Sequence, residues 1–268
     1  MIKLILSHLN LEQIANSGQC FRWNICGPCE VEAVAFGHVL HASQNGDEFT
    51  FSCTQDEWDS LWKNYFDENT DYDDIENRIL DSGDEYLKRA FAYGSGIRIL
   101  RQDLWETIVS FMISQNNNIP RIKGSINRIC EKAGLKADNS ADTYRFPLPG
   151  EVDPCIFIDR NLGLGYRDTY LYNIYKYAET NPLWISSLKE MPYEEAYKEL
   201  IDKKGIGKKV ANCICLFGLH HVGAFPIDTH IKQILDAHYP NGFDFARYEG
   251  VAGIIQQYMF YYKTSGNQ

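Results

Sequence analysis

The residues best suited to chemistry are two lysines behind a glycine-spaced turn, in the segment GIGKKVANCICLFG from Gly205 to Gly218. A helix N-terminus has free N–H donors and the positive end of the helix dipole, and glycines let an anion approach the backbone. Gly205 and Gly207 therefore predict a phosphate-binding turn, although the same spacing also suits a helix end followed by an ordinary tight turn. Behind the turn, Lys209 and Cys213 are four residues apart and share one helix face.

Lys209 has the features of a nucleophilic amine. A lysine at a helix start, partly desolvated against valine and cysteine, is expected to have a lowered pKa, although an ordinary solvated lysine fits the same position. Further along, the segment FPIDTHIKQIL places Asp228 as the N-cap of another helix. The same carboxylate could stabilise positive charge at C1′ of a sugar during glycosidic cleavage, and the spacing does not choose between the two roles.

Helical segments with clear ends surround these residues. The pattern DLWETIVSFMISQ predicts a helix that ends at three asparagines, and Pro120 then suits the first turn of a second helix that ends before Gly134. The segment LGLGYRDTYLYNIYKYAE repeats this design, with a glycine-spaced turn that leads into a helix. Pro192 opens a helix that Lys203 and Lys204 close, so Lys209 lies in a helix, glycine turn, helix arrangement.

The first part of the chain is predicted to form an antiparallel meander of strands between Val31 and Cys53. Asn45-Gly46 separates two β-prone stretches there, which is typical of a hairpin turn. After about Trp58 the pattern becomes helical. We therefore expect a β-sheet domain over residues 1–85 and a helical domain over residues 86–268.

The composition is that of a globular protein whose acidity is local. The formal net charge is −10, but twelve acidic residues lie between Asp56 and Glu85 against only Lys63 and Arg78, so the rest of the chain is neutral and does not exclude a nucleic-acid partner. The eight cysteines follow no signal peptide, which favours reduced thiols inside the cell. Cys26-x-x-Cys29 lacks a second metal-ligand pair, so we expect no metal site, and no apolar stretch is long enough for a membrane span.

Four separated blocks carry a resemblance to a known family. KKGIGKKVANCICL followed by FPIDTH resembles the helix-hairpin-helix, loop and aspartate signature of DNA glycosylases. Together with SGQCFRW, ILRQDLWETIVSFMISQNNNIPRI and LGLGYRDTYL, it looks like an 8-oxoguanine DNA glycosylase over most of residues 17–235. The resemblance implies an α+β fold, with a twisted N-terminal antiparallel sheet and then a two-lobed, all-helical body whose helix-hairpin-helix covers about residues 193–218.

The resemblance also implies a role for particular residues. Lys209 would attack C1′ of the damaged nucleotide and form a Schiff base, β-elimination would then nick the strand, and Asp228 would assist departure of the base. The remaining positions divide by role: base pocket Gly18, Cys213, Gln256 and Phe260; intercalation and reading of the opposite cytosine Asn116, Arg121, Tyr166 and Arg167; phosphate contacts Gly205, Gly207 and His230. Gln256 and Phe260 would equally suit a buried amphipathic helix.

These expectations define a bifunctional glycosylase and lyase that removes 8-oxoguanine opposite cytosine. The partner would be duplex DNA, the protein a monomer without cofactor or membrane contact, and its location the cytoplasm, or the nucleoid in a prokaryote. Lys204 stands where relatives often have proline, and no four-cysteine run for an iron–sulfur cluster follows the second helix. The alternatives are a monofunctional alkylpurine glycosylase, which would lack Lys209, and a non-catalytic DNA-binding protein.

Overall fold

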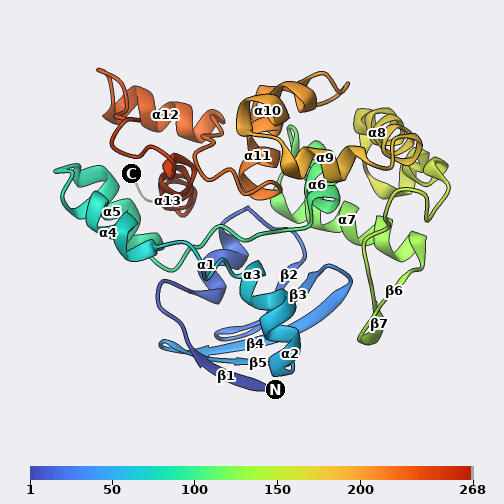
Figure 1. Cartoon of the computed structure of the whole chain (residues 1–268). Coiled ribbons are helices and arrows are strands. Elements are labelled where there is room, and N and C mark those ends of the chain that lie inside the picture. Colours follow the sequence, from blue (N-terminus) through green and yellow to red (C-terminus); the bar gives the residue numbers. More distant parts are fainter. Residues whose placement is uncertain (267–268) are drawn as a thin grey trace. The chain divides into compact units, whose positions relative to one another are not determined.

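The computed structural model describes residues 1–266 as an antiparallel sheet followed along the chain by a mostly helical body (Figure 1). Backbone contacts group the chain into two compact units. Unit 1 combines residues 1–32, 40–101 and 220 onward, and unit 2 combines residues 33–39 and 102–219. This grouping follows contacts and not the order of the chain, and the division into domains 1–85 and 86–268 stays a prediction.

Five strands form the N-terminal sheet in the order β1-β5-β4-β3-β2. They are β1 Ile2–Ile5, β2 Trp23–Gly27, β3 Glu30–Ala35, β4 His38–Asn45 and β5 Glu48–Phe51. Asn45 pairs with Glu48, and Gly46 has a φ of 61°, so the hairpin predicted at Asn45-Gly46 is confirmed. Strands β1 and β2 lie outside the range in which strands were predicted.

Aromatic side chains cover one face of the sheet. Phe49 and Phe51 are two residues apart in β5, so both side chains point to the same face of the sheet. Both are fully buried, and their ring centroids are 6.0 Å apart. Phe51 also contacts Trp58 at 4.6 Å and Phe66 at 5.3 Å between ring centroids. This cluster anchors the first helical segments after β5 on the sheet.

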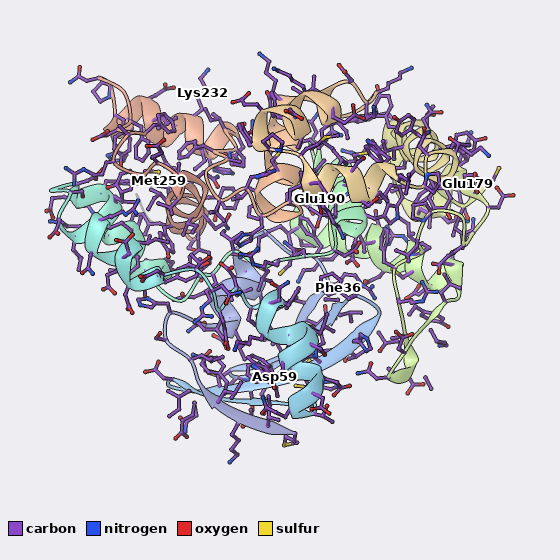
Figure 2. The ribbon with its side chains drawn as sticks, viewed as in Figure 1. Phe36, Asp59, Glu179, Glu190, Lys232 and Met259 are labelled. Atoms are coloured by element: carbon purple, nitrogen blue, oxygen red, sulfur yellow. The ribbon has the colours of Figure 1, made fainter. Side chains whose placement is uncertain are left out.

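The helices of unit 1 come from both ends of the chain. They are α1 Leu11–Asn16, α2 Gln55–Glu57, the π-helix Trp58–Trp62, α3 Lys63–Tyr65, α4 Tyr72–Leu80, α5 Glu85–Gly94, α12 Thr229–His238 and α13 Ala252–Thr264. Helices α5 and α13 lie side by side (Figure 1). Met259 of α13 is buried in unit 1, whereas Lys232 of α12 is exposed (Figure 2).

Unit 2 contains the helices on which the lysine pair depends. They are α6 Leu104–Ser114, α7 Ile119–Ala133, the 3-10 helices Pro154–Ile158, Arg160–Leu162 and Gly165–Arg167, α8 Asp168–Thr180, α9 Trp184–Glu190, α10 Tyr193–Ile201 and α11 Lys208–Phe217. Asn118 caps α7 by accepting from the Arg121 N–H at 3.1 Å, and Gly134 ends α7 in the left-handed conformation. The ends predicted for this helix are therefore confirmed.

A short β-hairpin interrupts the helical body. Strands β6 Lys136–Ala137 and β7 Ser140–Tyr144 pair antiparallel, directly after the left-handed residue Gly134. The body is therefore mostly helical, where an all-helical one was expected. Within residues 1–266, no helix is long and apolar enough to cross a membrane.

Candidate active site

The helix, glycine turn, helix arrangement is formed by α10, α11 and the residues between them. The Tyr193 hydroxyl at the start of α10 donates to Asn212 Oδ1 in α11 at 2.8 Å, which ties the two helices together. Gly205 has a φ of +94°, and a Cβ on it would lie 2.6–2.9 Å from ring and Cβ atoms of Tyr170. Only glycine fits this turn, because a side chain would be strained and would collide with Tyr170.

Helix α11 begins with an N-terminus that no side chain of the described residues caps. Its N-cap is Gly207, which has no side chain to accept from the first backbone N–H groups. Lys208 is exposed, whereas Lys209 is half-buried, with Nζ 5.5 Å from the ring centroid of Phe111. The amine of Lys209 thus lies at the positive end of a helix beside an apolar ring.

The inner face of α11 is closed to solvent. Cys213, one turn beyond Lys209, is 3% exposed, and Cys215 is fully buried. Burial raises the pKa of the Cys215 thiol to about 12, and the nearby Cys213 adds to the effect. Cys215 is therefore a neutral thiol.

The loop between α6 and α7 presents Asn116 at its surface. Asn116 is exposed and has a φ of +46°, a left-handed conformation that costs energy for most residues but is tolerated by asparagine. Arg121, in the first turn of α7, is exposed as well, and Tyr166 is 55% exposed. These three side chains are available to a partner on the surface of unit 2.

Arg167 is placed differently from its exposed neighbours. It is 7% exposed, and its Nε donates to the Gln115 carbonyl at 3.0 Å, while Nη2 donates to the carbonyls of Gln115 and Asn116. Its Nη1 donates to the Leu164 carbonyl at 3.1 Å. In this state the guanidinium holds the Asn116 loop, so contact with a base would require some of these bonds to be exchanged.

Asp228 caps α12, as the sequence predicts. Its Oδ1 accepts from the Ile231 N–H at 2.8 Å, and the side chain is half-buried. The loop ahead of it packs through Phe225 against Phe243 and Phe245, at 5.5 and 5.1 Å between ring centroids. Sequence reasoning missed this aromatic support, because Phe225 and its partners lie about twenty residues apart in the chain.

The predicted base-pocket residues of unit 1 lie on α13 and after α1. Gln256 is 4% exposed, and its Oε1 has no hydrogen-bond partner among residues 1–266. Phe260, four residues on and therefore on the same face, packs edge-on against the His230 ring at 5.9 Å. Gly18 has a φ of +77°, and the preceding Ser17 carbonyl accepts from Gln257 Nε2 at 2.6 Å, which fixes the backbone beside Gly18.

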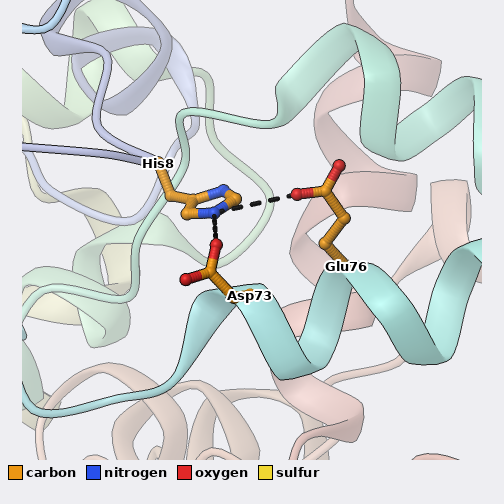
Figure 3. Close-up of side chains that lie close together, drawn as sticks. All are labelled: His8, Asp73 and Glu76. Atoms are coloured by element: carbon orange, nitrogen blue, oxygen red, sulfur yellow. Dashed lines mark hydrogen bonds and ion pairs between the residues drawn. The ribbon is translucent and has the colours of Figure 1, made fainter.

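Among residues 1–266, the side chains of His8, Asp73 and Glu76 lie close enough together that they could hold a metal ion. His8 Nε2 is 2.7 Å from Asp73 Oδ1 and 3.8 Å from Glu76 Oε2 (Figure 3). The Asp73 side chain is 80% exposed, so the hydrogen bond and ion pair explain how His8 is held against α4. The expected absence of a functional metal stays a prediction.

The candidate site residues thus fall into two sets. The residues in unit 2 are Asn116, Arg121, Tyr166, Arg167, Gly205, Gly207, Lys209 and Cys213, and those in unit 1 are Gly18, Asp228, His230, Gln256 and Phe260. Each unit brings some of its own set together: Arg167 with Asn116 in unit 2, and His230 with Phe260 in unit 1. The site role of each residue stays a prediction.

Comparisons with known proteins show which family the chain is similar to. Residues 1–108 match the family model described as 8-oxoguanine DNA glycosylase, N-terminal domain. A Saccharomyces cerevisiae N-glycosylase/DNA lyase is 36% identical over 167 residues, which cover 56% of this chain but only 44% of that protein. An Arabidopsis thaliana N-glycosylase/DNA lyase is 28% identical, and the match covers 87% of this chain and 67% of the relative.

A solved structure covers almost the whole chain. The Clostridium acetobutylicum 8-oxoguanine glycosylase/lyase, in complex with double-stranded DNA containing cytosine opposite 8-oxoguanine, has a TM-score of 0.90 and 33% identity. The match covers 98% of this chain and 94% of the Clostridium chain. A 3-methyladenine DNA glycosylase from Archaeoglobus fulgidus shares the fold, with a TM-score of 0.78 at 19% identity.

An antiparallel sheet, a helical body and a glycine hairpin followed by a lysine define a DNA glycosylase of the helix-hairpin-helix superfamily. Within the superfamily, the chain belongs to the family of 8-oxoguanine DNA glycosylase/lyases.

Proposed function

We propose that this protein excises 8-oxoguanine from duplex DNA opposite cytosine and then nicks the strand, with Lys209 as the nucleophile. The observation that carries the proposal is the position of Lys209, which lies in the first turn of the helix directly behind the glycine turn in a chain of this family. The Clostridium relative was crystallised with this base pair, which supports the same substrate here.

The proposed chemistry uses one amine and one carboxylate. The uncharged Lys209 Nζ attacks C1′, the bond from C1′ to the base nitrogen breaks, and the base departs with the electron pair and takes up a proton. Opening of the sugar ring then gives an imine between Nζ and C1′. Loss of a proton from C2′ expels the 3′ phosphate, and Asp228 stabilises positive charge at C1′ during the first step.

Recognition of the lesion is assigned to the base-pocket residues. The Gly18 carbonyl would accept the N7 hydrogen that 8-oxoguanine has and guanine lacks, so guanine would leave this acceptor unpaired. The unpartnered, buried oxygen of Gln256 supports a hydrogen bond to the base edge, since leaving it empty costs free energy. Phe260 would stack on the base, and Cys213 would line the pocket.

Extrusion of the base and reading of the opposite base are assigned to residues of unit 2. Flipping a base costs a few kcal/mol of unstacking, so a residue that fills the gap stabilises the opened duplex. Asn116 would fill this gap, Tyr166 would wedge beside it, and Arg121 with Arg167 would read the unpaired cytosine. Gly205, Gly207 and His230 would bind phosphates.

The partner we propose is duplex DNA, bound by a single copy of the chain. One chain carries every residue that the chemistry requires, so a monomer suffices. Because the substrate is DNA, we place the protein inside the cell, in the cytoplasm, and at the nucleoid if the source is a prokaryote.

The experiment that tests this function is cleavage of a labelled duplex with 8-oxoguanine opposite each of the four bases, with and without alkali. Cutting without alkali, fastest opposite cytosine, is expected. Cutting only after alkali would contradict the lyase step. No cutting would contradict the proposal and direct the search to alkylated bases, or to DNA binding without catalysis.

A further inference from the structure

One side chain outside the predicted site joins the loop of Asn116 to the turn ahead of Lys209. Gln115 directly follows α6, and its Nε2 donates to the Met112 carbonyl at 3.0 Å and to the Gly205 carbonyl at 3.0 Å. Gly205 lies four residues before Lys209. Gln115 therefore fixes the carbonyl of the positive-φ hairpin glycine from the side of the α6–α7 loop.

The backbone of Gln115 is held in turn by Arg167. The guanidinium of Arg167 donates to the Gln115 carbonyl through Nε at 3.0 Å and also through Nη2. A continuous series of hydrogen bonds thus runs from Arg167, through the backbone and side chain of Gln115, to Gly205. All three residues belong to unit 2.

A second contact joins the segment that carries Arg167 to the turn at Gly205. Tyr170, three residues beyond Arg167, supplies the ring against which Gly205 is packed. The turn ahead of Lys209 is therefore held both by Tyr170 and by Gln115. A movement of Arg167 can therefore affect the position of this turn, because Gln115 contacts both Arg167 and Gly205 directly.

We propose that Gln115 is a positioning residue that couples recognition of the opposite base to the hairpin turn in front of Lys209. The inference rests on the proposed function, in which Arg167 reads the unpaired cytosine. Arg167 is 7% exposed and is bonded to the carbonyls of Leu164, Gln115 and Asn116, so to reach a cytosine it must move and exchange bonds that it now makes to Gln115 and Asn116. The identity of the opposite base then acts on the hairpin through Gln115, and so on the rate of excision.

The test compares single-turnover excision of 8-oxoguanine opposite cytosine and opposite adenine. Gln115→Ala removes both side-chain bonds, and Gln115→Glu keeps the size but loses the donor. One hydrogen bond contributes on the order of 1 kcal/mol, so we expect the ratio of the two rates to fall roughly three- to tenfold in both variants. The expected change lies mainly in the rate opposite cytosine.

Asn117→Ala is the matched control. Asn117 lies in the same loop, and its Nδ2 donates to the Ile113 carbonyl at 3.1 Å, so it makes the same kind of bond to α6. No hydrogen bond described for residues 1–266 joins its side chain to the hairpin. We expect this variant to keep the wild-type ratio, which shows that general loosening of the loop is not the cause.

A double-mutant cycle with Arg167→Ala completes the test. If Gln115 acts through Arg167, the double variant loses no more discrimination than Arg167→Ala alone. An equal fall in rate opposite all four bases would overturn the coupling, because Gln115 would then support only the hairpin. An unchanged ratio in both Gln115 variants would overturn it as well. Failure of the wild-type protein to excise 8-oxoguanine would instead contradict the proposed function.

Discussion

Replacement of Gly205 by alanine tests how the hairpin turn is built. At a φ of +94° an alanine is strained, which costs about 1–3 kcal/mol. Its Cβ would also lie 2.6 Å from Cγ and 2.8 Å from Cβ of Tyr170. These atoms lie near the backbone and cannot easily move away, so overpacking adds about 1–3 kcal/mol. We therefore expect Gly205→Ala to lower the free energy of unfolding by roughly 2–6 kcal/mol.

Thermal unfolding monitored by circular dichroism measures this loss. For a chain of this size, each kcal/mol lowers the melting temperature by about 2–4 °C, so a fall of roughly 4–24 °C is expected. Gly207→Ala is the control, because Gly207 has a negative φ of −91° and a Cβ there meets nothing within 4 Å. The control should change stability by less than about 1 kcal/mol, yet weaken DNA binding, since its Cβ stands at the proposed phosphate site. A Gly205→Ala variant with the same melting temperature as the wild type would refute this account of the turn.

Three further substitutions separate structural from functional roles. Asp228→Asn should keep the cap of α12, with a stability change below about 1 kcal/mol, while the rate of base excision falls at least tenfold; a parallel loss of melting temperature would show that capping is its main role. Gln256→Met should leave stability unchanged or slightly raised, because the buried Oε1 has no described partner, but should weaken binding to 8-oxoguanine DNA; a drop in stability above about 2 kcal/mol would contradict this. Burial raises the pKa of Asp67, but the hydrogen bond from His220 and the nearby Arg101 outweigh it and hold that pKa below its ordinary value. The ionised carboxylate therefore stabilises the fold above the pKa of an unfolded aspartate, and this contribution is lost as the pH falls through the lower, folded-state pKa. Asp67→Asn should cost about 3–5 kcal/mol at pH 7 in chemical unfolding, and the difference from wild type should shrink in acid; a constant difference would count against the ionised pair.

Local signals in the sequence predicted the parts of the fold that depend on neighbouring residues. Asn118, Pro120 and Gly134 mark the ends of α7, and each acts through the backbone within one turn of the helix. Asn45-Gly46 likewise predicted the β4–β5 hairpin, since its turn needs only a left-handed residue. These features were predictable because their partners lie close in the chain.

Features that depend on distant partners could not be predicted in this way. Strand β1 pairs with β5, with Ile2 opposite Phe51, and four residues alone carry no clear strand pattern. The bond from Gln115 to Gly205 joins residues 90 positions apart, so the pattern around Gln115 showed only a helix end. The burial of Arg167 was also missed, because a guanidinium that follows an exposed tyrosine suggests a surface residue. The sequence therefore indicated which residues carry the chemistry more clearly than how they are held.

The measurement that tests the central proposal most directly is borohydride trapping of a covalent complex with duplex DNA that contains 8-oxoguanine opposite cytosine. Borohydride reduces an imine between a lysine and C1′ to a stable amine, so the trapped complex reports the nucleophile. Lys208→Gln, which removes the exposed neighbour, should trap as the wild type does, and Lys209→Gln should trap nothing while its melting temperature is unchanged. Equal trapping by Lys209→Gln would contradict the assignment, and loss of trapping in Lys208→Gln alone would place the nucleophile at Lys208.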